Sequence, residues 1–268
     1  MATTQTQTAA INGTTITYTD SGGDGPAVLF SHGFLMNHTM FDPQVAALAA
    51  DYRCIAWDER GFGGTPAPGP FSYWDSADDA VGLLDHLGID QAVFVGMSQG
   101  GYLSLRAALA HPDRVRALVL IDTMAGVDDA EAIEGYRGML GALTSGDEAT
   151  VDVVLQAVAS IIIGVPELND AWIPGWKQLV ATTDITFPGG ALLDRDDISG
   201  RLGEIACPAL VVHGTEDQAI SLEQARAMAD GLTDVRGVVE VEGAAHAANL
   251  SHPEVVNPPL REFLDALG

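Results

Sequence analysis

The chain has 268 residues, 47% apolar and 18% charged, which is the composition of a globular protein with one large α/β domain or two small ones. Its formal net charge of −25 at pH 7 gives a surface that repels nucleic acids and anionic membranes, so neither is expected as a partner.

The first 125 residues alternate between apolar strands and helices. An Asn-Gly turn predicts an opening hairpin within residues 9–20, and helical spacing beginning near Asp42, taken as a cap, and Pro43 predicts the first helix. Continuous apolar runs, typical of strands buried on both faces, begin segments 26–33, 53–65, 91–98 and 116–123. Further helices are predicted over 75–89 and 100–112. This order predicts a doubly wound, mostly parallel sheet.

The alternation breaks between residues 126 and 200, where three helices follow one another without a strand: 131–146, 149–164 and a short one over 170–184. Strands and helices resume with 207–217, 221–232, 235–243 and a final helix that Pro258 and Pro259 should kink. We expect a core made of 1–125 and 201–268 and a helical cap, or lid, made of 126–200. A cap over the carboxyl ends of the strands would cover the edge where such sheets bind ligands.

One serine stands where an apolar strand turns into a helix. Gly96 and Gly100 flank Ser98 closely enough for a sharp turn that exposes its hydroxyl. A serine nucleophile needs a base, and the base needs an acid that fixes its tautomer. Asp217 and His246 follow two later strands in the expected order, so all three should meet at one edge of the sheet.

Each of these assignments has an alternative. Ser98 is otherwise an ordinary turn residue, and Asp217 is otherwise the cap of the following helix. Asp122, at the end of the strand in 116–123, is the rival acid. Glu216 lies one position off the pattern and is expected to be solvated.

Five segments in the same order carry a family resemblance: "SHGF" (31–34), "DERGFGGT" (58–65), "GMSQGG" (96–101), "HGTED" (213–217) and "GAAHAANLSHPE" (243–254). The chain resembles the α/β-hydrolase family over nearly its whole length, and in particular small carboxylesterases, 3-oxoadipate enol-lactonase-like hydrolases and cofactor-free perhydrolases. The resemblance implies an eight-stranded sheet with a helical cap, no metal and no cofactor. It also implies the commoner placement of the acid, which favours Asp217 over Asp122, and a structural role for His32.

Two backbone N–H groups are expected to form an oxyanion hole. Gln99, the residue after the nucleophile, should supply one, aided by the amino end of its helix. The resemblance implies that Phe34 supplies the other.

A serine at this position favours acyl transfer through an acyl-enzyme. The leading prediction is hydrolysis of carboxylic esters of small to medium, largely apolar acids. Six apolar residues are candidates to line the substrate pocket, with ordinary packing as the alternative: Leu35, Met36, Met97, Met124, Trp172 and Trp176.

Other functions stay open. A lactone or enol-lactone hydrolase is one alternative, and perhydrolysis is a conceivable side activity of the same residues. A carbon–carbon bond hydrolase would need cationic groups, and the predicted cap, taken with the residue that follows it, offers only Arg137, Lys177, Arg195 and Arg201. A non-catalytic ligand receptor is the alternative of another class.

The cysteines, the opening residues and the apolar runs bear on the compartment in which the protein is expected. Cys54 and Cys207 should be free, buried thiols, and the opening residues lack the basic and apolar regions of a secretory signal. No apolar run is long enough to span a bilayer. We therefore expect a cytoplasmic protein whose partner is a small ester, with a homodimer allowed on general grounds.

Overall fold

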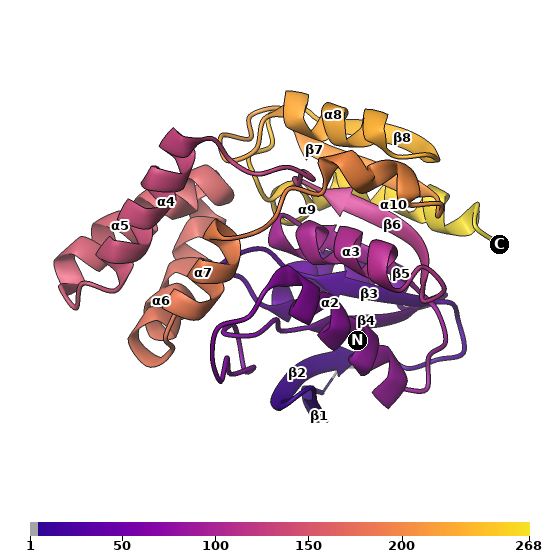
Figure 1. Cartoon of the computed structure of the whole chain (residues 1–268), viewed down its shortest axis with the longest axis horizontal. Helices are drawn as coiled ribbons and strands as arrows, with labels where there is room; N and C mark the ends of the chain where they lie inside the picture. Colours follow the sequence, from indigo (N-terminus) through magenta and orange to yellow (C-terminus); the bar gives the residue numbers. More distant parts are fainter. Residues whose placement is uncertain (1–4) are drawn as a thin grey trace.

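The sheet of the computed structural model, which describes residues 5–268, contains eight strands in the order β1-β2-β4-β3-β5-β6-β7-β8 (Figure 1). The β1–β2 and β2–β4 pairs are antiparallel, and the other pairs of neighbouring strands are parallel. The strands are β1 (Gln7–Ile11), β2 (Thr14–Asp20), β3 (Ala27–Ser31), β4 (Arg53–Trp57), β5 (Ala92–Met97), β6 (Val115–Ile121), β7 (Ala209–Gly214) and β8 (Val235–Val241). The predicted mostly parallel, doubly wound sheet is confirmed.

The apolar runs explain the central strands. Every residue of β5 is buried, and its neighbours β3 and β6 pair with it in parallel register, so helices must cover both faces. Because parallel strands end at the same edge, the loops after β3, β5, β6, β7 and β8 lie close together there. The opening hairpin also forms, with Asn12 and Gly13 both in the left-handed region that a tight turn requires.

The helices of the core are α1 (Asp42–Leu48), α2 (Tyr73–His86), α3 (Gln99–Ala110), α8 (Leu222–Gly231), α9 (Ala248–Ser251) and α10 (Pro253–Asp265), with 3₁₀ turns at η1 (His38–Phe41) and η2 (Ser199–Glu204). The α2 and α3 helices pack against each other, as do α1 and α10 (Figure 1). Within residues 5–268, no helix combines the length and the apolar composition needed to cross a membrane.

One prediction, for the start of the first helix, was wrong. Asp42 is not a cap: the η1 turn, capped by Asn37, leads directly into α1, so Asp42 is the first residue of that helix. The α10 helix continues through Pro258 and Pro259, and a kink at these residues stays a prediction. The carbonyls that lose an N–H donor there belong to Glu254 and Val255, which are exposed, so water can replace the missing bonds.

Four helices lie between β6 and β7, all within the segment predicted as a cap: α4 (Ala130–Leu143), α5 (Glu148–Ile162), α6 (Pro166–Thr182) and α7 (Thr186–Leu193). They form a separate group to one side of the sheet (Figure 1). The prediction of three helices missed α7, whose "TFPGGALL" contains a proline and two glycines. It also made α6 too short, since that helix has 17 residues and includes Pro174.

Candidate active site

The backbone between β5 and α3 bends sharply at Ser98, which has φ +53° and ψ −117°. This left-handed region is costly for a residue with a side chain, and such strain is concentrated at functional sites. The flanking glycines are needed because a Cβ atom at Gly96 would overlap the Gly100 carbonyl, and one at Gly100 would overlap the Ser31 carbonyl. The bend therefore places the Ser98 hydroxyl at the carboxyl edge of the sheet.

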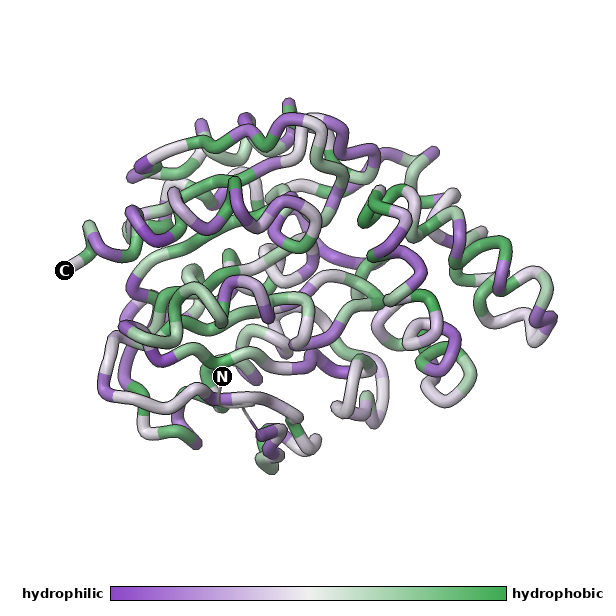
Figure 2. The backbone as a smooth tube through the Cα atoms, turned by 180° about the vertical axis from the view of Figure 1, so that it is seen from behind, coloured by the Kyte–Doolittle hydropathy of each residue, from purple (hydrophilic) through white to green (hydrophobic). Residues whose placement is uncertain are grey.

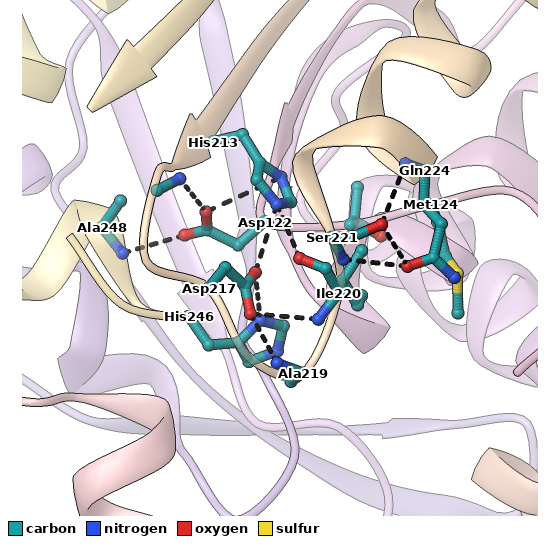
Figure 3. Close-up of polar contacts among 12 residues, drawn as sticks. Asp122, Met124, His213, Asp217, Ala219, Ile220, Ser221, Gln224, His246 and Ala248 are labelled. Carbon is teal, nitrogen blue, oxygen red and sulfur yellow. Dashed lines mark hydrogen bonds and ion pairs between the residues drawn. The ribbon is translucent and has the colours of Figure 1, made fainter. Parts of the chain in front are cut away.

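Ser98, His246 and Asp217 form a continuous hydrogen-bonded chain. The Ser98 hydroxyl lies 2.9 Å from His246 Nε2, and His246 Nδ1 lies 2.8 Å from Asp217 Oδ2. The other Asp217 oxygen accepts hydrogen bonds from the backbone N–H groups of Ala219 and Ile220, at 2.8 and 3.0 Å (Figure 3). These bonds hold the carboxylate against the imidazole, so three residues from three loops meet as the sequence predicted.

The charges of Asp217 and His246 support each other. Burial opposes the protonation of His246, but the charge and hydrogen bond of Asp217 outweigh it and raise the pKa of His246 above its ordinary value. Burial likewise opposes the ionisation of Asp217, yet the charge and hydrogen bond of His246 keep the pKa of this carboxyl below its ordinary value. The arrangement therefore favours an ionised Asp217 that can stabilise a protonated imidazole.

Two backbone N–H groups lie on the segments that flank Ser98. Gln99 is the first residue of α3, where an N–H has no partner within the helix, and Phe34 lies in the loop after β3. Among the hydrogen bonds within residues 5–268, neither N–H has a protein acceptor. The next residue, Leu35, has φ +64°, so this loop also departs from ordinary backbone geometry.

The chain is similar to known proteins in sequence and in fold. Residues 26–155 match the family model of the alpha/beta hydrolase fold. A Variovorax paradoxus protein named "Putative carbamate hydrolase RutD" is 32% identical over 90% of this chain and 92% of its own. The enol-lactonase from Burkholderia xenovorans LB400 is 29% identical, with a TM-score of 0.85 over 97% of this chain and 100% of that one. A thermophilic esterase from Thermogutta terrifontis is 28% identical, with a TM-score of 0.82 over 98% and 99%.

The chain belongs to the α/β-hydrolase family. Its relatives in sequence and the proteins of similar structure include enol-lactonases and esterases. These proteins are named as hydrolases of different bonds, so the family alone does not fix which bond is cleaved.

In this hydrolase, four of the six predicted pocket residues surround one cavity. The cavity has a volume of about 260 Å³ and lies between the loop after β3 and helix α6. Leu35 and Met36 line it from the loop, and Trp172 and Trp176 line it from the cap. The Trp176 side chain is 1% exposed, and within the described chain its Nε1 has no hydrogen-bond partner.

Met97 and Met124 are buried but do not line this cavity. Met97 packs so closely against Gly33 that a side chain at that glycine would collide with its sulfur. The Met124 sulfur accepts a hydrogen bond of 3.2 Å from Gln224 Nε2 of α8 (Figure 3). Their place in a substrate pocket stays a prediction.

Asp122, the rival acid, lies on the far side of Asp217 from His246 (Figure 3). Its two oxygens accept hydrogen bonds of 2.8 Å from the backbone N–H groups of Gly214 and Ala248. Burial and the charge of Asp217 raise the pKa of Asp122 to about 8. Asp122 therefore ties the loops after β6, β7 and β8 together, and it does not contact the imidazole of His246 through a hydrogen bond.

His213, near the end of β7, completes this cluster. Its Nε2 lies 2.9 Å from the Ile220 carbonyl oxygen and 3.3 Å from Asp217 Oδ2, so it also helps to place the acid. Ligand atoms of Asp122, His213 and Asp217 lie within 4.8 Å of one another, the spacing of a metal site. Both carboxylates are already engaged by backbone N–H groups, however, which argues for a structural cluster.

Other histidines have structural partners. His32 is buried, and its Nε2 accepts a hydrogen bond of 3.0 Å from the Glu59 backbone N–H. His38 Nδ1 lies 2.7 Å from Asp58 Oδ1, a pairing that the sequence did not indicate. Both contacts join the loop after β3 to the loop after β4, in agreement with the structural role predicted for His32.

Proposed function

We propose that this hydrolase is a serine esterase that cleaves carboxylic esters of small to medium apolar acids through an acyl-enzyme. The observation that carries the proposal is the hydrogen-bonded chain from Ser98 through His246 to Asp217, at 2.9 and 2.8 Å. A hydroxyl, an imidazole and an ionised carboxylate in this order are the requirements of nucleophilic acyl transfer.

In the proposed reaction, Ser98 Oγ attacks the ester carbonyl carbon while its proton passes to His246 Nε2. The backbone N–H groups of Phe34 and Gln99 donate hydrogen bonds to the oxygen as it becomes negative. The tetrahedral intermediate then expels the alcohol, which takes the proton from His246, and leaves the acyl group on Ser98. Water, deprotonated by His246, attacks this ester by the same route and releases the acid.

The preference for apolar acids rests on the apolar part of the cavity between the loop after β3 and helix α6, whose wall also contains the polar residues Gln178 and Thr182. Its walls include Leu35, Met36, Trp172 and Trp176, and its volume of about 260 Å³ suits a small ligand. The buried Trp176 Nε1 has no acceptor within residues 5–268, so an oxygen of the substrate would satisfy it.

The test is hydrolysis of p-nitrophenyl esters from acetate to decanoate by the parent and by Ser98→Ala. We expect kcat to fall by about 10⁴- to 10⁶-fold in the variant. Ser145→Ala, at an exposed cap position, is the matched control and should leave the rate unchanged. In the parent, kcat/KM should fall as the pH is lowered, because His246 must be neutral to act as the base. The midpoint of this fall should lie above about 6.5, the ordinary pKa of histidine, because the pKa of His246 is raised.

A lactone is the second candidate substrate, and the observation favouring it is the 29% identity to an enol-lactonase over 97% of the chain. A lactone is a cyclic ester, so the same steps open its ring and the alcohol stays attached to the acyl group. A butenolide enol-lactone assayed beside the ester series separates the two: a kcat/KM about tenfold above that of the best ester would favour the lactonase. A folded parent that turns over neither class would contradict both proposals and leave a ligand receptor.

A further inference from the structure

Glu59 is a buried carboxyl group that the proposed reaction does not use. It is the second residue after β4 and is 1% exposed. The neighbouring Arg60 does not neutralise it, because that guanidinium is paired with Asp79 of α2, with an Nη2–Oδ1 distance of 2.8 Å. A lone carboxyl group in such a position is expensive to ionise and calls for an explanation.

The hydrogen bonds of Glu59 reach both segments that carry the candidate oxyanion donors. Its side-chain Oε2 accepts a hydrogen bond of 2.5 Å from Gln99 Nε2. Its backbone N–H donates to His32 Nε2 at 3.0 Å, and His32 Nδ1 in turn donates to the Gly33 carbonyl oxygen at 2.8 Å. Gln99 carries one donor N–H, and Gly33 immediately precedes the other, that of Phe34.

The Gln99 side chain is held at both ends. The Tyr73 hydroxyl donates to its Oε1 at 3.3 Å, while Glu59 receives its amide hydrogen. Gln99, Glu59 and Tyr73 are all buried, so these contacts hold the side chain of the first residue of α3. Ser98 and the N–H of Gln99 lie at the start of this same helix.

Burial favours the neutral form of Glu59. Burial raises the pKa of Glu59 to about 8, against the lowering effect of the nearby Ser76 hydroxyl. Glu59 Oε1 and Ser76 Oγ form no hydrogen bond of good geometry within the described chain. A protonated carboxyl can still accept from Gln99 through its other oxygen.

We propose that Glu59 is a positioning residue that aligns the two oxyanion donors by linking the Gln99 side chain to the loop of Phe34. The inference rests on the proposed serine-hydrolase function. Glu59 touches no reacting atom, so its effect passes through Gln99 and His32.

Ionisation of Glu59 should reduce turnover. A negative charge behind the donors would oppose the negative charge that develops on the substrate oxygen, in a site of low dielectric. The groups that face Glu59 are Tyr73, Ser76 and Asp79 of α2, Gln99 of α3, His32 of the loop after β3, and Arg60 of its own loop. Asp79 disfavours the charge and Arg60 favours it, and their mutual pairing leaves burial dominant.

The test compares kcat and KM for p-nitrophenyl acetate from pH 6 to 9.5 in the parent, Glu59→Gln and Glu59→Ala. In the parent we expect kcat to fall on the alkaline side with a midpoint near 8. Glu59→Gln, which resembles the protonated acid, should keep kcat within about threefold at pH 7 and lose the alkaline decline. Glu59→Ala should lower kcat by about ten- to a hundredfold with KM within about twofold, since misaligned donors weaken only the transition state.

Two further variants show which carboxyl group causes the alkaline decline of kcat and whether Glu59 acts through Gln99. Asp122, beside the candidate acid, also has its pKa raised to about 8, so Asp122→Asn shows whether that carboxyl causes the alkaline decline. Gln99→Met keeps the backbone donor but cuts the link to Glu59, and its loss of kcat should match that of Glu59→Ala. In the double variant the two losses should not add, because they break one connection.

Each outcome bears on one proposal or on both. An alkaline decline that persists in Glu59→Gln and vanishes in Asp122→Asn, or additive losses in the double variant, would overturn the positioning role while leaving the serine mechanism intact. A parent without turnover that depends on Ser98 would overturn both. If Glu59→Ala does not fold, as circular dichroism would reveal, the pH profile of Glu59→Gln still decides.

Discussion

The carboxyl edge of the sheet and the helical cap are built differently. At the edge, Leu35, Ser98 and Asp122 have positive φ angles, and buried hydrogen bonds fix the side chains that meet there. In the cap, α5 exposes apolar side chains, with Val153 70% and Ile161 38% exposed. Figure 2 shows hydrophobic segments on these cap helices as well as along the central strands.

The two regions are joined by a few buried contacts. Arg195, which follows α7, pairs with Asp128, which precedes α4, at 2.7 Å, so the two ends of the cap segment are tied together. The same guanidinium lies 4.6 Å from the centre of the Tyr102 ring of α3, which attaches this point to the core. The carboxyl edge of the sheet holds the candidate catalytic residues, so substitutions there should have large effects. The cap contributes to the cavity wall, and substitutions on its exposed side should have smaller effects.

The largest effect should come from the acid at the edge. Asp217→Asn should lower kcat by about 10⁴-fold, since the wrong tautomer of His246 then faces Ser98. Asp122→Asn should lower kcat at pH 7 by less than about tenfold, because that carboxyl contacts backbone N–H groups instead of the imidazole. Steady-state kinetics of both variants would reveal a reversed order if Asp122 were the acid.

A smaller effect, on stability, should come from the buried ion pair of the core. Asp79 is fully buried, and Asp79→Asn leaves the Arg60 guanidinium without its counter-charge. We expect a loss of about 3–5 kcal/mol in the free energy of unfolding. Urea denaturation at pH 7 measures it, and a loss below about 1 kcal/mol would mean that water reaches Arg60 more easily than its 11% exposure suggests.

The smallest effect should come from the matching pair in the cap. Lys177 and Asp152 lie 2.6 Å apart, but each side chain is 42% exposed. Asp152→Asn should therefore change the free energy of unfolding by at most about 1 kcal/mol. If Asp152→Asn lowered the free energy of unfolding as much as Asp79→Asn in the same urea experiment, the cap would be no more tolerant of substitution than the sheet and its loops.

The same contrast explains what the sequence could predict. Strands such as β5 are continuous apolar runs, which are stable only when helices cover both faces of the sheet. The sheet could therefore be predicted from the sequence. The residues of the candidate site could be predicted because each follows a predicted strand: Ser98 and Asp217 follow the fully buried β5 and β7, and His246 follows β8 at the edge of the sheet. The meeting of these three side chains is a consequence of parallel topology, which the alternation of elements already implies.

Contacts between residues far apart in the sequence could not be predicted. No local pattern marks the hydrogen bond between Glu59 and Gln99, 40 residues apart, or that of His38 with Asp58. The α7 helix, with a proline and two glycines in eight residues, forms against its own propensity because neighbouring helices bury Ala191 and Leu192. Tertiary packing decides such cases, and propensity alone does not.

Lys177 is the only lysine of the chain, and it lies on α6 directly after Trp176, a wall of the cavity. An amine-reactive fluorophore would therefore find one lysine side chain, partly exposed and positioned on the cap. Trp176 is a natural quencher next to that position. The sequence thus provides a spectroscopic reporter of ligand entry that leaves every residue of the sheet edge unchanged.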